Sequence, residues 1–151
     1  MIVIVDYGYG NVFSVESALN RIGYRCILTN DTDIIKAAKI IILPGVGAFK
    51  QAITRLKQTN LDNAIIKAVK NGAGIIGICL GYQMLFEQSE ENGIFIGLGL
   101  LKGNVVSLKS LNTNHIKVPN IGWRLLIKNE ENNFFTKDNE ENYVYFVHSF
   151  V

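Results

Sequence analysis

The sequence is poor in the residues that crosslink proteins or bind metal ions. It has two cysteines and two histidines among 151 residues, with no Cys-x-x-Cys motif and no pair of histidines at ligand spacing. We therefore expect no disulfide and no metal site. The N-terminal apolar run is too short for a secretory signal, which favours a reducing, cytoplasmic location.

Long apolar runs and an excess of one charge are absent as well. No run reaches the roughly 20 apolar residues that a membrane-spanning helix needs. The 15 basic and 13 acidic residues are interspersed and leave a net charge of +2, so neither nucleic acid nor a membrane is indicated as a partner. Apolar residues make up 48% of the chain, and we expect residues 1–151 to form a single domain with its own core.

Strands and helices alternate through the first half of the sequence. The Ile-rich strands lack polar alternation, which is typical of parallel strands buried on both faces. We predict strands over Ile2–Val5, Arg25–Thr29, Lys39–Leu43 and Ile75–Ile78, and helices over Val12–Ile22, Thr32–Ala38, Phe49–Leu56, Leu61–Lys70 and Leu80–Phe86. This order predicts an α/β fold with a doubly wound, mostly parallel central sheet.

The second half has few helical patterns. Short strands are predicted over Ile94–Leu98, Asn104–Leu108, Arg124–Ile127 and Tyr143–Val147, with polar turns between them. We expect them to form a mixed or antiparallel segment added beside the main sheet or onto it.

Cys79 lies at the junction between the fourth predicted strand and the helix that follows it. Gly77 and Gly81 stand two positions before and after it, the pattern of a nucleophile elbow, in which a tight turn leaves no room for side chains at those places. A thiol at the start of a helix is favoured as thiolate. The elbow predicts acyl transfer through Cys79. A buried structural cysteine between packing glycines is the alternative.

Loops at the carboxyl ends of parallel strands meet at one edge of a sheet, where ligands bind. The loop after the third strand carries Gly45, Val46 and Gly47, and its backbone can turn N–H groups inward. Together with the N–H of Leu80, it is a candidate oxyanion hole for a carbonyl attacked by Cys79. A tight turn without further function is the alternative for this loop.

The loop after the first strand resembles a dinucleotide-binding fingerprint. Phe13, however, occupies the place of its third glycine, where a helix must pack closely on a strand. We therefore expect no nicotinamide cofactor, and no cofactor of any kind. Asp6 in this loop either acts in the site or satisfies the turn, and we favour the turn.

Several motifs together resemble one enzyme family. In order, they are Asp6-Tyr7-Gly8-Tyr9-Gly10-Asn11, Leu43-Pro44-Gly45-Val46-Gly47-Ala48-Phe49, Gly77-Ile78-Cys79-Leu80-Gly81-Tyr82-Gln83, Gly97-Leu98-Gly99-Leu100, Ile121-Gly122-Trp123 and Tyr145-Phe146-Val147-His148-Ser149-Phe150. They resemble the glutaminase subunits of imidazole glycerol phosphate synthases, triad (class I) glutamine amidotransferases of histidine biosynthesis. The resemblance spans the whole chain.

The resemblance implies a flavodoxin-like fold, a reaction and a partner. Cys79 would attack the side-chain amide of glutamine and form a thioester, and Gln83 would help to hold the glutamine. Ammonia would pass to a (β/α)₈-barrel synthase in a heterodimer. Asn11, Trp123 and His148 would lie near the site or the partner interface. For Trp123, the residues alone favour a place in the core.

The general base is missing from the matched motifs. His148 ends a predicted strand and would be nominated from the residues alone, and His115 lies in a polar loop. The family carries its catalytic His and Glu in a later His-Pro-Glu segment, and this sequence has no His-x-Glu. The chain is either a fragment without its C-terminal segment or a shortened homologue. Its end directly after a strand favours a fragment, and we expect little or no glutaminase turnover from it.

Three other functions stay open. The residues Tyr82, Asn120 and Arg124 depart from the family pattern and leave room for a paralogue that feeds a related, sugar-amidating synthase. A non-catalytic interaction module would keep the fold without the base. A thiol hydrolase or redox-sensing relative would use another acid near Cys79, such as Asp6.

Overall fold

The computed structural model describes residues 1–111, 117–126 and 142–151. Within these ranges no helix has the length and apolar character needed to cross a membrane. The elements, in chain order, are β1 (Ile2–Val5), α1 (Val12–Arg21), β2 (Cys26–Thr29), α2 (Thr32–Lys36), β3 (Ile40–Gly45), α3 (Phe49–Gln58), α4 (Leu61–Lys70), β4 (Gly74–Cys79), α5 (Leu80–Gln83), β5 (Gln88–Ser89), β6 (Phe95–Ile96), β7 (Asn104–Val105), the 3₁₀ helix η1 (Leu108–Leu111), β8 (Asn120–Leu125) and β9 (Tyr143–His148).

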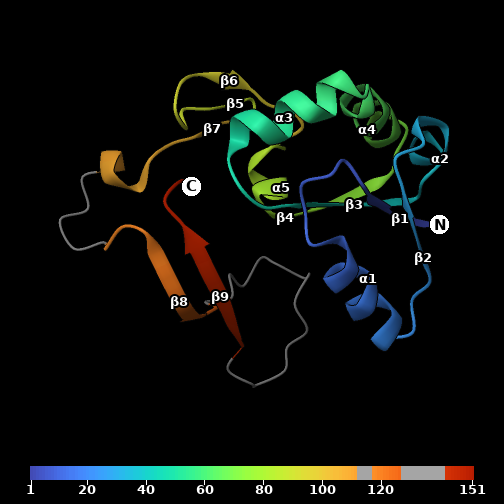
Figure 1. Ribbon diagram of the computed structural model, residues 1–151, viewed down its shortest axis with the longest axis horizontal. Coiled ribbons are helices and arrows are strands. Elements are labelled where there is room, and N and C mark those ends of the chain that lie inside the picture. Colours follow the sequence, from blue (N-terminus) through green and yellow to red (C-terminus); the bar gives the residue numbers. More distant parts are fainter. Residues whose placement is uncertain (112–116, 127–141) are drawn as a thin grey trace. The chain divides into compact units, whose positions relative to one another are not determined.

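The central sheet has the order β2-β1-β3-β4, and all of its strands are parallel. Strand β1 lies between β2 and β3, so the chain reverses its direction of travel across the sheet after β2. Register aligns Ile42 of β3 with Ile4 on one side and Ile76 on the other. The loops after β1, β3 and β4 therefore leave the same edge of the sheet (Figure 1).

Helices cover the sheet from both sides, as the doubly wound prediction requires. Helices α2, α3 and α4 bury Ile35, Phe49 and Ile65 in one core cluster with Val3 and Leu43 from the strands. Helix α1 lies on the opposite side, against β1 and β2 (Figure 1). The predicted α/β class and the mostly parallel sheet are confirmed.

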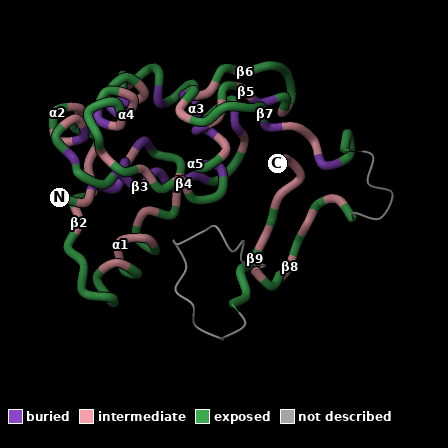
Figure 2. The backbone as a smooth tube through the Cα atoms, turned by 180° about the vertical axis from the view of Figure 1, so that it is seen from behind, coloured by how far each residue is buried: buried purple, intermediate pink, exposed green. Residues whose placement is uncertain are grey.

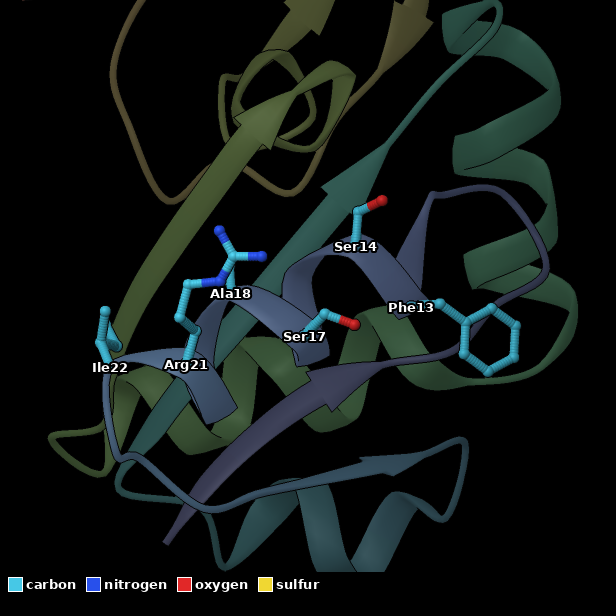
Figure 3. Close-up of a pocket in the computed structure, with 6 residues that line it drawn as sticks. All are labelled: Phe13, Ser14, Ser17, Ala18, Arg21 and Ile22. Carbon is cyan, nitrogen blue, oxygen red and sulfur yellow. The ribbon is translucent and has the colours of Figure 1, made fainter.

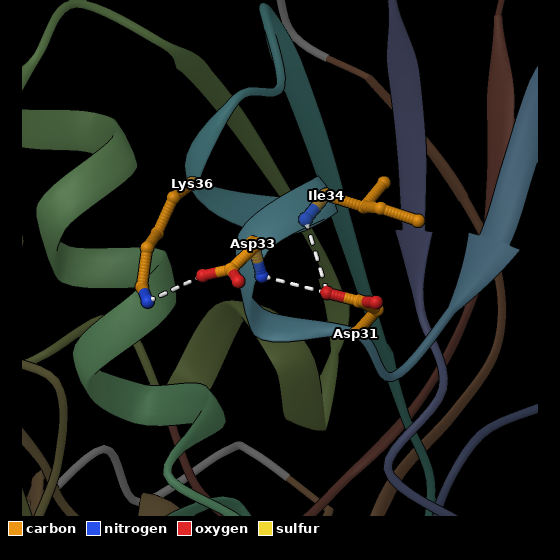
Figure 4. Close-up of polar contacts among 4 residues, drawn as sticks. All are labelled: Asp31, Asp33, Ile34 and Lys36. Carbon is orange, nitrogen blue, oxygen red and sulfur yellow. Dashed lines mark hydrogen bonds and ion pairs between the residues drawn. The ribbon is translucent and has the colours of Figure 1, made fainter.

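Side chains cap the first two helices, whereas α3, α4 and α5 begin without a side-chain cap. Asn11 accepts the N–H of Ser14 and begins α1, as its sequence position predicts. Asp31 accepts the N–H groups of Asp33 and Ile34 at the start of α2 (Figure 4). Helix α3 begins after Ala48, whose side chain cannot cap it. The first N–H group of this helix, that of Phe49, donates instead to the carboxylate of Glu91.

Strands of the second half form two further sheets. Strand β5 pairs antiparallel with β6 and parallel with β7, which makes a small mixed sheet, while β8 and β9 form an antiparallel pair. The prediction of short mixed and antiparallel strands is confirmed.

Some of the predicted bounds are wrong. Strand β8 begins at Asn120 instead of Arg124, because pairs such as Ile121–Val147 extend the ladder. Helix α5 ends at Gln83 instead of Phe86, because the Phe86 N–H bonds three residues back, to the carbonyl of Gln83.

The backbone divides into two compact units, Met1–Val106 and Ser107–Val151. The buried residues gather in the first unit (Figure 2). The single domain expected over residues 1–151 stays a prediction. His115 lies outside the described residues, and so does Ile127 at the end of a predicted strand.

Candidate active site

Cys79 occupies the sharp corner between β4 and α5. It is exposed, and its backbone has φ 55° and ψ −118°. Asn60 and Asn92 also have positive φ, but asparagine tolerates that region, whereas a cysteine there is strained by about 1–3 kcal/mol. The alternative of a buried structural cysteine is wrong for this residue.

The glycines beside Cys79 are required by close backbone contacts. A Cβ atom on Gly77 would meet the backbone of Gly81 and Tyr82, at the start of α5. A Cβ atom on Gly81 would meet the backbone of Leu43 and Pro44, on the neighbouring strand. The elbow therefore folds tightly on itself and is pressed against the end of β3.

The loop after β3 runs directly beside the cysteine. Cys79 is paired in register with Gly45, and a Cβ atom on Gly45 would lie 2.6 Å from the backbone nitrogen of Gly81. Beyond it, Val46 is exposed and Gly47 has φ 92°, a conformation that favours glycine. The structure thus brings together the residues that the sequence nominated for the thiol and for the oxyanion hole.

Helix α5 carries the remaining residues nominated for this corner. Leu80 follows the cysteine as the first helical residue, with a buried side chain. Gln83 is the last residue of α5, about one turn further on, and is half-buried.

Two residues of this region escaped the sequence analysis. The hydroxyl of Tyr7 donates a hydrogen bond to the carbonyl oxygen of Pro44 at 2.8 Å. The carboxylate of Glu91 accepts the N–H of Phe49 at 2.7 Å. Tyr7 stands in the first motif loop, which was a usable signal, but nothing in the sequence pairs Glu91 with Phe49.

Burial raises the pKa of the Tyr7 phenol well above its usual range, and a negative charge on Cys79 raises it further. The phenol therefore remains a hydrogen-bond donor at neutral pH. Its hydrogen bond to Pro44 connects the first loop to the end of β3.

Polar residues of the first loop serve local structure. Asp6 accepts the N–H of Gly8 at 3.2 Å, which agrees with the predicted turn role. Asn11 is occupied with the cap of α1. Further along the chain, Asp31 lies near the position at which a dinucleotide-binding fingerprint carries its acidic residue, but its carboxylate caps α2 (Figure 4).

Trp123 and His148 belong to the second unit, on paired strands. Trp123 is 65% exposed and packs edge-on against Tyr145, so it does not take the place in the core that the residues alone favour. Its place near the site or the partner interface, which the resemblance implies, stays a prediction. The His148 ring has a partner at each nitrogen, with Nδ1 3.0 Å from the carbonyl oxygen of Phe150 and Nε2 2.9 Å from the amide nitrogen of Asn120. A carbonyl oxygen accepts and an amide NH₂ group donates, so in this arrangement Nδ1 donates to Phe150 and Nε2 accepts from Asn120.

Two shallow surface grooves lie outside the elbow. One, of about 480 Å³, is lined by α1 and the residue after it (Figure 3), namely Phe13, Ser14, Ser17, Ala18, Arg21 and Ile22. The other, of about 490 Å³, is lined by residues between Glu87 and Asn104. Across residues 1–111, 117–126 and 142–151, no three His, Cys, Asp or Glu side chains gather as metal ligands would.

Comparison with known sequences points to one family. The family model described as "Glutamine amidotransferase class-I" matches residues 3–151. The chain is 46% identical over 152 residues to "Imidazole glycerol phosphate synthase subunit HisH" of Geobacillus sp. (strain WCH70), covering 99% of this chain and 72% of the relative. Identity to the protein of the same name is 47% in Bacillus subtilis (strain 168), with 71% of it covered, and 41% in Aquifex aeolicus (strain VF5), with 70% covered.

Solved structures agree on the fold. A structure titled "Crystal structure of glutamine amidotransferase" matches with a TM-score of 0.66 and 20% identity, over 83% of this chain and 64% of that chain. A putative peptidase E protein from Listeria monocytogenes EGD-e matches with a TM-score of 0.52 and 15% identity, over 66% of this chain and 62% of that one. The family model and the relatives together show that this chain belongs to the class-I glutamine amidotransferase family.

Proposed function

We propose that this chain is the glutaminase component of an imidazole glycerol phosphate synthase. It hydrolyses glutamine through Cys79 and passes the ammonia to a (β/α)₈-barrel synthase subunit. The main support for this chemistry is the exposed, strained Cys79 elbow beside the loop after β3. The names of relatives that are 41–47% identical support the pathway.

The reaction runs through a thioester. The Cys79 thiolate forms a bond to the amide carbon of the glutamine side chain, and the carbonyl electron pair moves to oxygen. We assign that oxyanion to N–H groups of Leu80 and of the loop Gly45–Gly47. Collapse expels the nitrogen, which takes up a proton and leaves as ammonia, and water then releases glutamate. Gln83, on the helix that follows the nucleophile, holds the glutamine.

The general base remains to be supplied. Both ring nitrogens of His148 are engaged in hydrogen bonds, so no lone pair is free to take a proton from the Cys79 thiol. The sequence contains one other histidine and no His-x-Glu. We therefore propose that this chain alone turns glutamine over little, although Cys79 still reacts with electrophiles that mimic glutamine.

An exposed ladder of apolar side chains on β8 and β9 supports the proposed contact with a synthase partner. Three cross-strand pairs lie on one face, and each of their members is at least 45% exposed: Ile121–Val147, Trp123–Tyr145 and Leu125–Tyr143. Exposed aromatic and aliphatic side chains gathered in this way are typical of protein interfaces. We assign this ladder to the contact with the synthase, with Trp123 as its anchor.

The same proposal includes a single domain over residues 1–151 and a cytoplasmic location. One family model matches residues in both compact units, which supports a single glutamine amidotransferase domain over residues 1–151. Both cysteines are free, and the reaction requires a free thiol at the exposed Cys79. A reducing cytoplasm meets that requirement.

Labelling of the thiol tests the chemistry without the missing base. The probe is a chloromethyl ketone analogue of glutamine, in which the cysteine sulfur displaces chloride and forms a thioether. Mass spectrometry should find wild type and the control Cys26→Ser labelled at Cys79, much faster than by iodoacetamide at equal concentration. Cys79→Ser should not be labelled at that position. Labelling of Cys26 at the same rate as Cys79 would overturn the proposal.

A further inference from the structure

The loop between β3 and α3 is anchored at both ends by side chains from distant parts of the sequence. At its start, the hydroxyl of Tyr7 donates to the carbonyl oxygen of Pro44 across 37 residues. At its end, the carboxylate of Glu91 accepts the N–H of Phe49 across 42 residues. The segment between these two bonds, residues 45–48, contains the glycines proposed for the oxyanion hole.

The anchor at Tyr7 is rigid. Its side chain is only 2% exposed, and its ring stacks on Tyr9 with the centroids 6.1 Å apart. The phenol stays protonated because burial disfavours the charged form. Opening this bond would leave a buried donor without an acceptor, which is unfavourable, so the bond to Pro44 resists opening.

The anchor at Glu91 replaces a missing helix cap. Ala48 stands at the N-cap position of α3 and has no side-chain acceptor, so Glu91 supplies one from outside the helix. A carboxylate is also favoured at the positive end of the helix dipole.

Glu91 is itself held in place. Its N–H donates to the hydroxyl of Ser89, a fully buried residue of β5, the central strand of the small sheet. The same sheet is tied to α3 by the Lys57 ammonium, which donates to the Ile96 carbonyl at 2.9 Å, and by Lys50, which lies over the Phe95 ring. Glu91 is therefore fixed relative to α3.

We propose that Tyr7 and Glu91 are positioning residues that clamp the two ends of the oxyanion loop and so hold its N–H donors against Cys79. The inference rests on the function proposed for this loop. Donors stabilise an oxyanion only if they are already oriented when the charge develops. A loop with several glycines orients itself poorly, because glycine has the widest conformational freedom. The clamp removes that freedom from outside the loop.

Amide hydrogen exchange tests the clamp without any reaction. The variants are Tyr7→Phe and Glu91→Ala, and the controls are Tyr9→Phe in the same loop and Glu90→Ala, an exposed neighbour. Exchange over residues 45–49 should be faster in both variants and unchanged in both controls. Glu91→Gln keeps an acceptor oxygen and should restore most of the protection that Glu91→Ala loses.

Labelling with the glutamine chloromethyl ketone tests the consequence for the site. The inactivation rate constant at saturation should fall about ten- to a hundredfold in Tyr7→Phe and Glu91→Ala, less than the effect of deleting an oxyanion donor outright. The concentration for half-saturation should stay near the wild-type value, because the clamp acts on the donors and not on ligand binding. The rate with iodoacetamide should not change, because that rate reports the thiol alone.

The outcomes separate the two proposals. Wild type labelled no faster by the glutamine analogue than by iodoacetamide would defeat the proposed function itself. Selective labelling of wild type together with unchanged exchange and inactivation in both variants would defeat only the clamp. A change only in the concentration for half-saturation would also overturn the clamp proposal, since it would show that these residues bind the substrate.

Discussion

The two compact units of this chain differ in how they bury their apolar residues. The unit Met1–Val106 encloses a core in which sheet residues such as Ile41 and helix residues such as Leu56 are fully buried. Within the described part of Ser107–Val151, Leu108 is the buried apolar residue, and the strands β8 and β9 leave large apolar side chains exposed. The backbone of both strands is coloured as exposed or intermediate in Figure 2. A two-stranded pair has too few layers to bury both of its faces.

Under the proposed function, the unit with the core carries the chemistry and the second unit carries the surface that binds the partner. The strained Cys79 corner needs a rigid frame, since a backbone outlier persists only where the surroundings over-determine it. The unit with the core contains that corner, the loop after β3 and both proposed clamp residues. The second unit carries apolar surface that a partner can cover.

The largest expected effect on stability comes from a leucine-to-alanine substitution in the first unit, compared with the same substitution in the second. Leu56→Ala creates a cavity in the core and should lower the free energy of unfolding by about 2–5 kcal/mol. Leu125→Ala removes a side chain that is 45% exposed and should change that free energy by no more than about 0.5 kcal/mol.

Two probes in urea denaturation follow the units separately. The described α-helices all lie in Met1–Val106, so far-UV circular dichroism reports that unit. The single tryptophan, Trp123, reports the other unit by fluorescence. Equal costs for Leu56→Ala and Leu125→Ala would break the comparison.

The second prediction tests whether the Cys79 elbow depends on its close packing against β3. A Cβ atom added by Gly81→Ala would collide with the backbone of β3, and overpacking of this kind costs about 1–3 kcal/mol. We expect that loss of stability together with loss of selective labelling at Cys79. Gly74→Ala, at the start of the strand β4 that leads into the elbow, is the control. A Cβ atom there meets nothing closer than 3.9 Å, so stability and labelling should stay near wild type.

A third prediction tests the second unit as a recognition surface. Trp123→Ala should weaken binding to the synthase by about 2 kcal/mol, roughly thirtyfold in Kd, because large aromatic anchors dominate interfaces. Ile94→Ala, which changes a 70% exposed side chain of the first unit, is the control and should bind as wild type does. Isothermal titration calorimetry measures both. An unchanged Kd for Trp123→Ala would remove the role assigned to the apolar ladder.

The smallest effect belongs to a helix cap. Asp31→Ala should destabilise the first unit by about 1 kcal/mol, because two N–H groups at the start of α2 lose their acceptor. Asp33→Ala removes only a surface ion pair with Lys36 and should cost at most about 0.5 kcal/mol. Thermal unfolding followed by circular dichroism distinguishes the two, and equal shifts would show that Asp31 contributes no more than a surface charge.

Local sequence patterns predicted much of the fold and the centre of the candidate site. Unbroken apolar strands predicted the parallel sheet, and the glycines around Cys79 predicted the elbow, because both depend on a few neighbouring residues. Bounds were less accurate where pairing across strands decided them, as at Asn120 in β8. The residues alone could not decide between a place in the core and a place at an interface for Trp123, because an aromatic residue in a strand packs equally well in either.

The amino-acid sequence alone determined the order of strands and helices, the Cys79 elbow and the loop beside it, since each depends on short-range sterics and on apolar periodicity. Only the tertiary structure decided that Tyr7 and Glu91 reach the ends of that loop, that His148 has both ring nitrogens engaged, and that one face of β8 and β9 is exposed. Those contacts join residues distant along the chain, or depend on hydrogen-bond geometry and burial. No local pattern of residues encodes them.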